Sequence, residues 1–286
     1  MRRSLHVFRM ELRLGRRGLL IWTAVLVIVV GVYLGLFPYL QDPVMVEVLK
    51  AFPEALLEAL SFSPTAIGDV NTYHGTYVMG YVVLLATIYG LMQAGGSVSR
   101  EPDLGAVEFL YTRPVSRKEI MVAKIGAFVL LVATLWVLVF AASTVVGLAV
   151  AEDEYDLAVQ AMTHLAGLLA TLAAGGVAFA VAPFFQRMQT ATSVGVGIGL
   201  GSFVLHALSQ LSDRVRFFRY FSLQYYAALD RTAAGDPFVP GMLVLLGIFL
   251  AGAVLVGGLM FASDRMNLFT GNAAAGGSET IGTGVK

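Results

Sequence analysis

Six long apolar segments constrain this chain more than any other feature of its sequence. They span residues 18–36, 76–98, 125–149, 158–185, 190–211 and 238–263. A helix of about 20 apolar residues crosses a hydrocarbon core about 30 Å thick. The chain is 57% hydrophobic and 13% charged, whereas soluble domains have about 45–50% and about 25%. The sequence therefore predicts an all-α polytopic membrane protein with six transmembrane helices, of which the fourth is long enough to tilt or break.

Basic residues are distributed unequally between the segments that connect these helices. If both termini lie inside, the inner segments hold fourteen of the 19 basic residues. These are Arg2, Arg3, Arg9, Arg13, Arg16, Arg17, Arg100, Arg113, Arg117, Lys118, Lys124, Arg187, Arg265 and Lys286. Because short cytoplasmic segments of membrane proteins are enriched in Lys and Arg, the bias predicts that both termini are cytoplasmic.

The regions before and after the spans have distinct compositions. Residues 1–17 combine an apolar side, which includes Leu5, Phe8 and Leu12, with six arginines. This pattern predicts an interfacial helix suited to anionic headgroups, although the arginines can equally serve only to fix orientation. Residues 18–269 form the expected transmembrane domain. Residues 270–286 are small and polar and are predicted to be a flexible tail.

The stretch between Ser99 and Lys124 is charged and lies between two uncharged spans. Its apolar side comprises Leu104, Val107, Phe109, Leu110 and Tyr111, and its charged rim comprises Arg113, Arg117 and Lys118. An aromatic anchor surrounded by charges is typical of a contact with a soluble partner. The alternative is an amphipathic helix that rests on headgroups, but its four acidic residues would be repelled by an anionic surface.

Polar side chains within the spans suggest a second candidate site. An i, i+4 ridge that leads into and along the second span comprises Tyr73, Tyr77, Tyr81, Tyr89 and Gln93, with Leu85 filling the gap, and His206 lies in the fifth span. The candidate lining residues are Tyr77, Tyr81, Tyr89, Gln93 and His206. One interpretation is that these residues line a translocation path. The other is interfacial anchoring and hydrogen bonding between helices, which membrane proteins use routinely.

Signatures of catalysis are weak. The sequence has no cysteine, which excludes thiolate catalysis. His164 and His206 lie within spans and suggest an intramembrane serine–histidine dyad, but no GxSxG motif is present, and no metal-ligand spacing accompanies them. In the stretch most similar to a phosphate loop, residues 271–278, Gly277 replaces the required lysine. A histidine-dependent intramembrane enzyme and a self-sufficient secondary transporter remain as alternatives, although no span contains an acidic residue.

The charged stretch resembles the corresponding loop of type-2 (exporter-type) ATP-binding-cassette (ABC) permeases. The matching residues are Arg100, Glu101, Asp103, Gly105, Glu108, Phe109, Leu110, Pro114, Val115, Ser116, Arg117, Ile120 and Lys124. Six spans, a basic N-terminal helix and an aromatic segment before the last span are similar as well. Ala106 stands where the family commonly has threonine, and the usual basic cluster after the sixth span is reduced to Asp264 and Arg265.

The resemblance implies a permease subunit of an ABC exporter rather than an enzyme. Residues 1–17 would be its elbow helix, and a coupling helix between spans 2 and 3 would contact a separate ATPase subunit. The expected contact residues are Arg100, Glu101, Asp103, Leu104, Glu108, Phe109, Leu110, Tyr111, Arg113, Pro114, Arg117 and Lys118. A second permease subunit, identical or similar, would complete a dimer in the cytoplasmic membrane of a prokaryote. The resemblance places ATP and Mg²⁺ on the partner and implies no cofactor or metal on this chain. The apolar spans favour an amphipathic or hydrophobic substrate.

Overall fold

The computed structural model describes residues 2–51, 68–103, 117–151, 154–185 and 187–276. All regular secondary structure in these ranges is helical, and six helices are long and apolar enough to cross a membrane. The all-α class and the six spans predicted from the sequence are thus confirmed. The long helices are α1 (Arg2–Gly35), α7 (Met79–Asp103), α9 (Arg117–Ala151), α10 (Leu157–Val181), α11 (Met188–Leu211) and α14 (Val239–Gly276).

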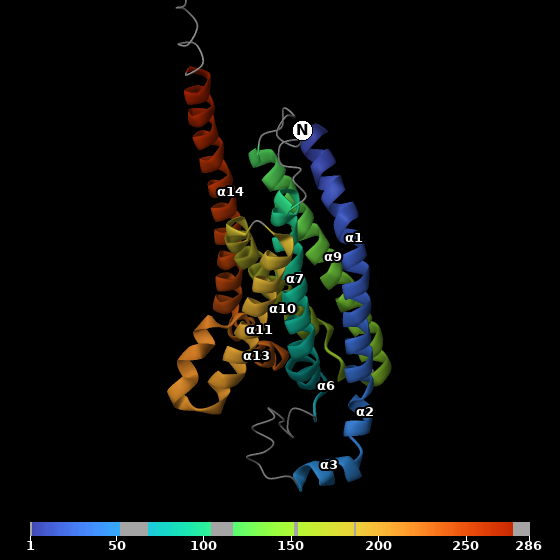
Figure 1. The fold of residues 1–286 in the computed structure, drawn as a ribbon. Helices are drawn as coiled ribbons and strands as arrows, with labels where there is room; N and C mark the ends of the chain where they lie inside the picture. Colours follow the sequence, from blue (N-terminus) through green and yellow to red (C-terminus); the bar gives the residue numbers. More distant parts are fainter. Residues whose placement is uncertain (1, 52–67, 104–116, 152–153, 186, 277–286) are drawn as a thin grey trace, which may run out of the picture.

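Helices α7 and α10 form the centre of the bundle. In their apolar windows 61% and 67% of the residues are buried, against 22–39% in the other four spans. Helix α7 contacts α10, α11, α1 and α9, whereas α10 also contacts α14. Figure 1 shows α1 beside α9 on one side of the bundle and α14 on the opposite side. A short helix, α6 (Val70–Tyr73), and a π-helical turn, η1 (His74–Val78), precede α7 and extend the second span.

Local sequence sets the ends of α10. Asp156 caps the helix, since its carboxylate accepts hydrogen bonds from the backbone N–H groups of Ala158 and Val159 at 2.8 and 3.2 Å. At the other end, the 3₁₀ turn η3 (Ala182–Phe184) contains Pro183, which cannot continue a regular helix. The fourth apolar segment therefore ends in a tight turn.

The bundle has two distinct ends. Helix α1 begins, α7 ends, α9 begins and α14 ends at one of them, here called the loop end (Figure 1). The other, here called the hairpin end, carries α2 (Phe37–Leu40), α3 (Pro43–Lys50), η4 (Asp213–Phe221), α12 (Leu223–Ala227) and α13 (Leu229–Ala233).

Two boundaries expected from the sequence do not coincide with helix ends. Helix α1 runs without a break from Arg2 to Gly35, so residues 2–17 and the first span form one helix. Helix α14 continues through Gly276, which places the first residues of the expected tail in a helix. Residues 277–286 lie outside the described part of the chain.

Candidate functional site

A buried ion pair joins three helices at the loop end. The Glu11 Oε1 atom of α1 lies 3.4 Å from the Lys124 Nζ atom of α9, and both side chains are 3% exposed. Lys124 also donates a hydrogen bond to the backbone carbonyl of Ser97 in α7. A buried charge needs such partners, because removing it from water is costly. One lysine thus holds α1, the end of α7 and the beginning of α9 together.

Close packing around this pair draws the same helices together. A Cβ atom added at Gly15, one turn after Glu11, would lie 2.4 Å from Leu131 Cδ1 and 2.9 Å from Gln93 Nε2. A larger residue at this position would require the Leu131 and Gln93 side chains to move, so glycine favours the close approach of α1 to α9 and α7. Ser99 adds a link to the turn after α10, since its hydroxyl lies 3.4 Å from the carbonyl oxygen of Ala182.

Sequence reasoning missed Glu11 as a functional residue, although a signal exists. Glu11 is the only acidic residue before Asp42. It shares a helical face with Gly15 and Leu19, both of which are buried. A single carboxylate on the apolar side of a basic helix indicates a buried cationic partner. The sequence does not say which cation that is.

The two helices that flank the predicted coupling stretch, α7 and α9, end and begin at the loop end. Residues 104–116 lie outside the described part of the chain, and with them most of the predicted contact residues: Leu104, Glu108, Phe109, Leu110, Tyr111, Arg113 and Pro114. Arg100, Glu101 and Asp103 belong to the final turn of α7, and Arg117 and Lys118 begin α9. Lys118 is exposed. Contact of this stretch with an ATPase stays a prediction.

The tyrosine ridge of the second span faces α1. The Tyr73 hydroxyl donates to the carbonyl oxygen of Tyr33 at 2.9 Å. The rings of Tyr81 and Tyr33 lie 5.2 Å apart, and those of Tyr89 and Trp22 lie 6.1 Å apart. Within one protomer these side chains therefore contribute to helix packing.

The predicted lining residues do not gather in one place. Tyr77 is half-buried, with its ring 5.6 Å from that of Tyr73, and Gln93 lies beside Gly15. His206 belongs to α11, which packs on another side of α7 around Leu91. A role of these residues in translocation stays a prediction.

Histidines form a second polar cluster toward the hairpin end. The Tyr155 hydroxyl lies 3.0 Å from His74 Nδ1. Burial raises the pKa of the Tyr155 phenol, so the hydroxyl stays protonated. His164 donates from Nδ1 to the Gln160 carbonyl oxygen at 2.8 Å, which leaves Nε2 to accept from Ser143 Oγ at 3.1 Å.

The Ser143–His164 contact has the distance of a catalytic dyad but not its surroundings. Ser143 is 0% exposed and His164 is 4% exposed, so a substrate cannot reach the hydroxyl in this conformation. The second nitrogen of His164 meets a backbone carbonyl rather than a carboxylate. Among the described residues, no group of three or more metal-ligating side chains is present. The cluster is suited to joining α9 and α10 through hydrogen bonds.

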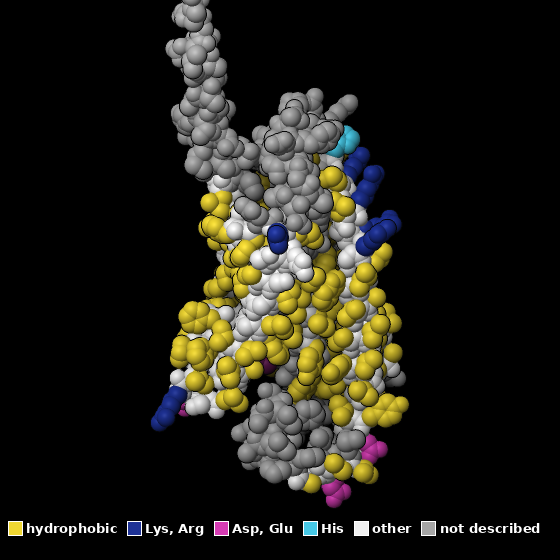
Figure 2. Space-filling model, in the orientation of Figure 1, with side chains coloured by type: hydrophobic (Ala, Val, Ile, Leu, Met, Phe, Trp, Pro, Cys, Tyr) yellow, Lys and Arg dark blue, Asp and Glu magenta, His cyan; other side chains and the backbone are white. Residues whose placement is uncertain are grey.

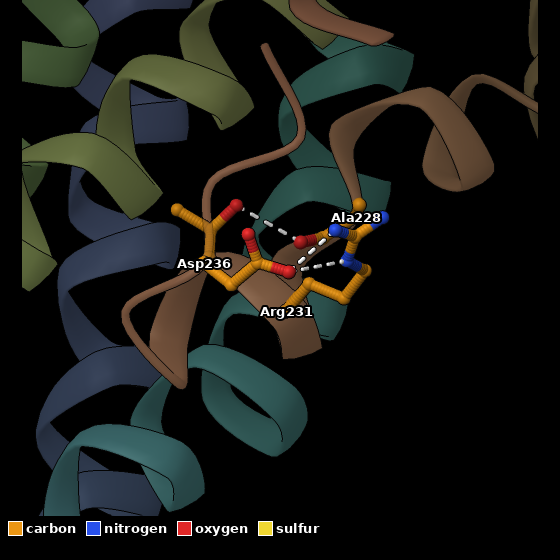
Figure 3. Close-up of polar contacts among 4 residues, drawn as sticks. Ala228, Arg231 and Asp236 are labelled. Atoms are coloured by element: carbon orange, nitrogen blue, oxygen red, sulfur yellow. Dashed lines mark hydrogen bonds and ion pairs between the residues drawn. The ribbon is translucent and has the colours of Figure 1, made fainter. Parts of the chain in front are cut away.

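The segment after α11 folds into a compact hairpin. Ala228, between α12 and α13, adopts a left-handed conformation with φ 42°, and its carbonyl oxygen accepts from the Thr232 hydroxyl at 2.9 Å. Arg231 then pairs with Asp236, with Nε 3.2 Å from Oδ2. Figure 3 shows this ion pair bracing the turn that leads into α14. The aromatic segment before the last span thus consists of short helices.

The hairpin docks on the second span. A Cβ atom added at Gly75, in η1, would lie 2.1 Å from the Cβ atom of Ala233 and 3.2 Å from the carbonyl oxygen of Leu229. The hydroxyl of Ser202 in α11 lies 2.9 Å from Gln224 Oε1 in α12. Both contacts fix the hairpin between α11 and the π-helical turn.

The helical membrane fold agrees with the result of a comparison against known protein families. A family model described as ABC-2 family transporter protein matches residues 5–264, which is most of the 286 residues. No curated protein matches the chain significantly. The match covers all six spans and the stretch between α7 and α9. The chain therefore belongs to the ABC-2 transporter family, as a multi-pass membrane permease, a transport subunit rather than an enzyme, of the kind that associates with ABC ATPase subunits.

Proposed function

We propose that this chain is the permease subunit of an ABC exporter that moves an amphipathic or hydrophobic substrate across the cytoplasmic membrane of a prokaryote. A separate ATPase subunit binds ATP and Mg²⁺ and supplies the energy, and this chain binds no cofactor. Two permease subunits, identical or similar, form the pathway. Both termini and residues 104–116 face the cytoplasm.

The observation that carries this proposal is the junction at Lys124. Residues 104–116 connect two helices that Lys124 joins to each other and to α1. A displacement of these residues by the ATPase therefore moves α7, α9 and α1 together rather than one helix alone. ATP binding can shift the permease only if the ATPase contacts differ between its two states. A rigid junction allows that difference to reach the spans.

The apolar character of the spans supports the substrate class. The six apolar segments contain no acidic residue, so coupling to protons or sodium ions has no obvious carrier within them. This argues against a self-sufficient secondary transporter. Aromatic and aliphatic side chains offer surface to an amphipathic cargo but few charges to a hydrophilic one.

Retention of the ATPase tests the coupling stretch directly. We expect Phe109→Ala to weaken ATPase binding by about 2 kcal/mol or more if this ring is the interface anchor. Charge reversal by Glu108→Arg should weaken it in a salt-dependent way. The measurement is copurification of the ATPase with the tagged permease, together with substrate-stimulated ATP hydrolysis.

Phe184→Ala is the matched control, because this exposed phenylalanine lies in the turn between α10 and α11 and outside the coupling stretch. It should leave ATPase retention unchanged. If the combined Phe109→Ala and Glu108→Arg variant inserts correctly and still retains a stimulated ATPase, the assignment of this stretch as the coupling element is wrong.

A further inference from the structure

The outward side of α1 carries a row of exposed arginines. Arg9, Arg13, Arg16 and Arg17 are all exposed, whereas Glu11 on the opposite side is buried. Within the described part of the chain these four guanidinium groups make no ion pair or hydrogen bond. Figure 2 shows the basic side chains along this helix, above an apolar surface. We call these four residues the arginine face.

The arginine face borders a hollow with a mixed lining. The hollow has a volume of about 470 Å³ and is lined by His6, Arg9, Met10, Arg13 and Leu14. Cationic and apolar side chains thus alternate around one space. An anionic group attached to a hydrocarbon chain fits such a lining better than a free ion does, because both parts of it find a partner.

The length of α1 places the arginine face at a membrane boundary. Residues 18–36 span about 28 Å at about 1.5 Å per residue, close to the thickness of a hydrocarbon core. Leu20, Ile21 and Ile28 in this part are exposed in the protomer and offer an apolar surface to lipid. Arg16 and Arg17 then lie where the hydrocarbon ends, and Arg13 lies about 6 Å farther out, within the headgroup layer.

The ion pair at Lys124 determines which side of α1 meets the lipid. Because Glu11 is held against α9 and α7, the helix cannot rotate about its axis to bury an arginine. The guanidinium groups are therefore presented outward in a fixed arrangement. Arginine suits this position, since its planar group can form two parallel hydrogen bonds with one phosphate.

We propose that the arginine face binds the headgroup phosphates of anionic phospholipids in the leaflet at the loop end. Arg9 and Arg13 hold one headgroup, with its acyl chain along Leu14, and Arg16 and Arg17 hold others at the hydrocarbon boundary. Assignment of this leaflet as cytoplasmic, where anionic lipids are enriched, rests on the proposed function. The lipid preference itself does not depend on the ATPase.

Spin-labelled lipids test this proposal on the permease alone. The purified chain is reconstituted in phosphatidylcholine without ATPase, and electron paramagnetic resonance compares the association of labelled phosphatidylglycerol and phosphatidylcholine. We expect a preference for phosphatidylglycerol that weakens with added salt. The Arg9→Gln/Arg13→Gln variant should reduce that preference by up to about fivefold per arginine. The Arg16→Gln/Arg17→Gln variant should reduce it similarly.

Each variant keeps part of the basic N-terminal segment, so the signal that orients the chain is preserved. Arg9→Lys/Arg13→Lys is the matched control and should retain most of the preference, because the charge remains. An unchanged preference in both glutamine variants overturns the proposal. If the lipid preference stays intact and a separate copurification shows that the same variants lose the ATPase, the arginine face instead contacts an acidic protein surface, which also overturns the proposal. Because the lipid measurement uses no ATPase, its failure is distinct from failure of the coupling experiment.

Discussion

At the scale of one residue, Lys124 shows how a buried charged side chain can join several helices. Its partners Glu11 and Ser97 come from helices that are far apart in the sequence, and the two charged side chains are 3% exposed. Removing one member of a buried ion pair costs more than replacing both members by apolar residues of similar volume.

We expect Lys124→Met to destabilise the permease by about 3–5 kcal/mol, because it removes the ammonium group that lies 3.4 Å from the buried Glu11 carboxylate. The double variant Glu11→Leu/Lys124→Met should recover most of this loss, since it removes both charges and keeps side-chain volume. Thermal unfolding in detergent measures both. Equal destabilisation of the single and double variants would mean that the ion pair is not the source of the effect.

A second residue-scale prediction separates a structural from a catalytic histidine. Ser143→Ala removes the hydroxyl that lies 3.1 Å from His164 Nε2 and leaves that nitrogen unsatisfied, at a cost of about 1–3 kcal/mol. We expect lower thermal stability with unchanged transport per folded molecule. Ser209→Ala, whose hydroxyl bonds only a backbone carbonyl, is the control. Abolished transport in folded Ser143→Ala protein would instead support the enzymatic alternative.

Individual contacts were the part of the site that sequence could not predict. The arginines of residues 1–17 and the tyrosine ridge were visible as patterns because they depend on local spacing. The pairing of Glu11 with Lys124, and of His74 with Tyr155, depends on which helices are neighbours. Spacing within one helix carries no information about that choice.

At the scale of elements, apolar length predicted the helices well and their boundaries less well. Each predicted span coincides over most of its length with one of the six long helices, because a membrane requires a minimum apolar length. The same requirement sets no maximum, so α1 and α14 continue through the polar residues that flank their spans. The fourth predicted segment extends to residue 185, whereas α10 ends at Val181 and is followed by the turn η3, which contains Pro183.

The close contact between η1 and α13 allows a prediction about how the hairpin packs on the second span. Gly75→Ala would place a Cβ atom 2.1 Å from Ala233 and should destabilise the protein by about 1–3 kcal/mol through overpacking. Gly80→Ala, in the same span, meets nothing within 4 Å. It should leave stability unchanged or raise it by up to about 1 kcal/mol. Thermal unfolding compares the two, and equal effects would argue against close docking of the hairpin.

For the whole molecule, the glycines of α11 divide into two faces. Gly195 and Gly199 face Leu91 of α7, whereas a Cβ atom at Gly197 or Gly201 would meet nothing within 4 Å. The first pair explains packing inside the protomer. The second pair leaves a flat surface on which another permease subunit can pack closely.

We expect Gly197→Leu to reduce dimer formation while the protomer stays folded, because the new side chain fills space that the protomer leaves open. Gly247→Leu on α14 is the control, since its surroundings are equally open. Crosslinking in native membranes with the ATPase present measures the dimer fraction. Full crosslinking of the Gly197→Leu protein would place the dimer contact elsewhere.

Orientation of the whole chain is tested by single cysteines, which are unambiguous because the natural sequence contains none. Glu154 lies at the hairpin end between α9 and α10, and Arg187 lies between α10 and α11; both are exposed. An impermeant thiol reagent added to intact cells should label Glu154→Cys and not Arg187→Cys. The reverse pattern would invert the proposed topology.

The π-helical turn at His74–Val78 also affects how sequences of related permeases should be compared. A π-helical turn accommodates about one residue more than a regular turn. A relative that lacks one residue here can keep α7 intact, yet its preceding residues would be rotated by about 100° around the helix axis. Single-residue gaps at this position therefore mark homologues in which a different set of side chains meets the hairpin.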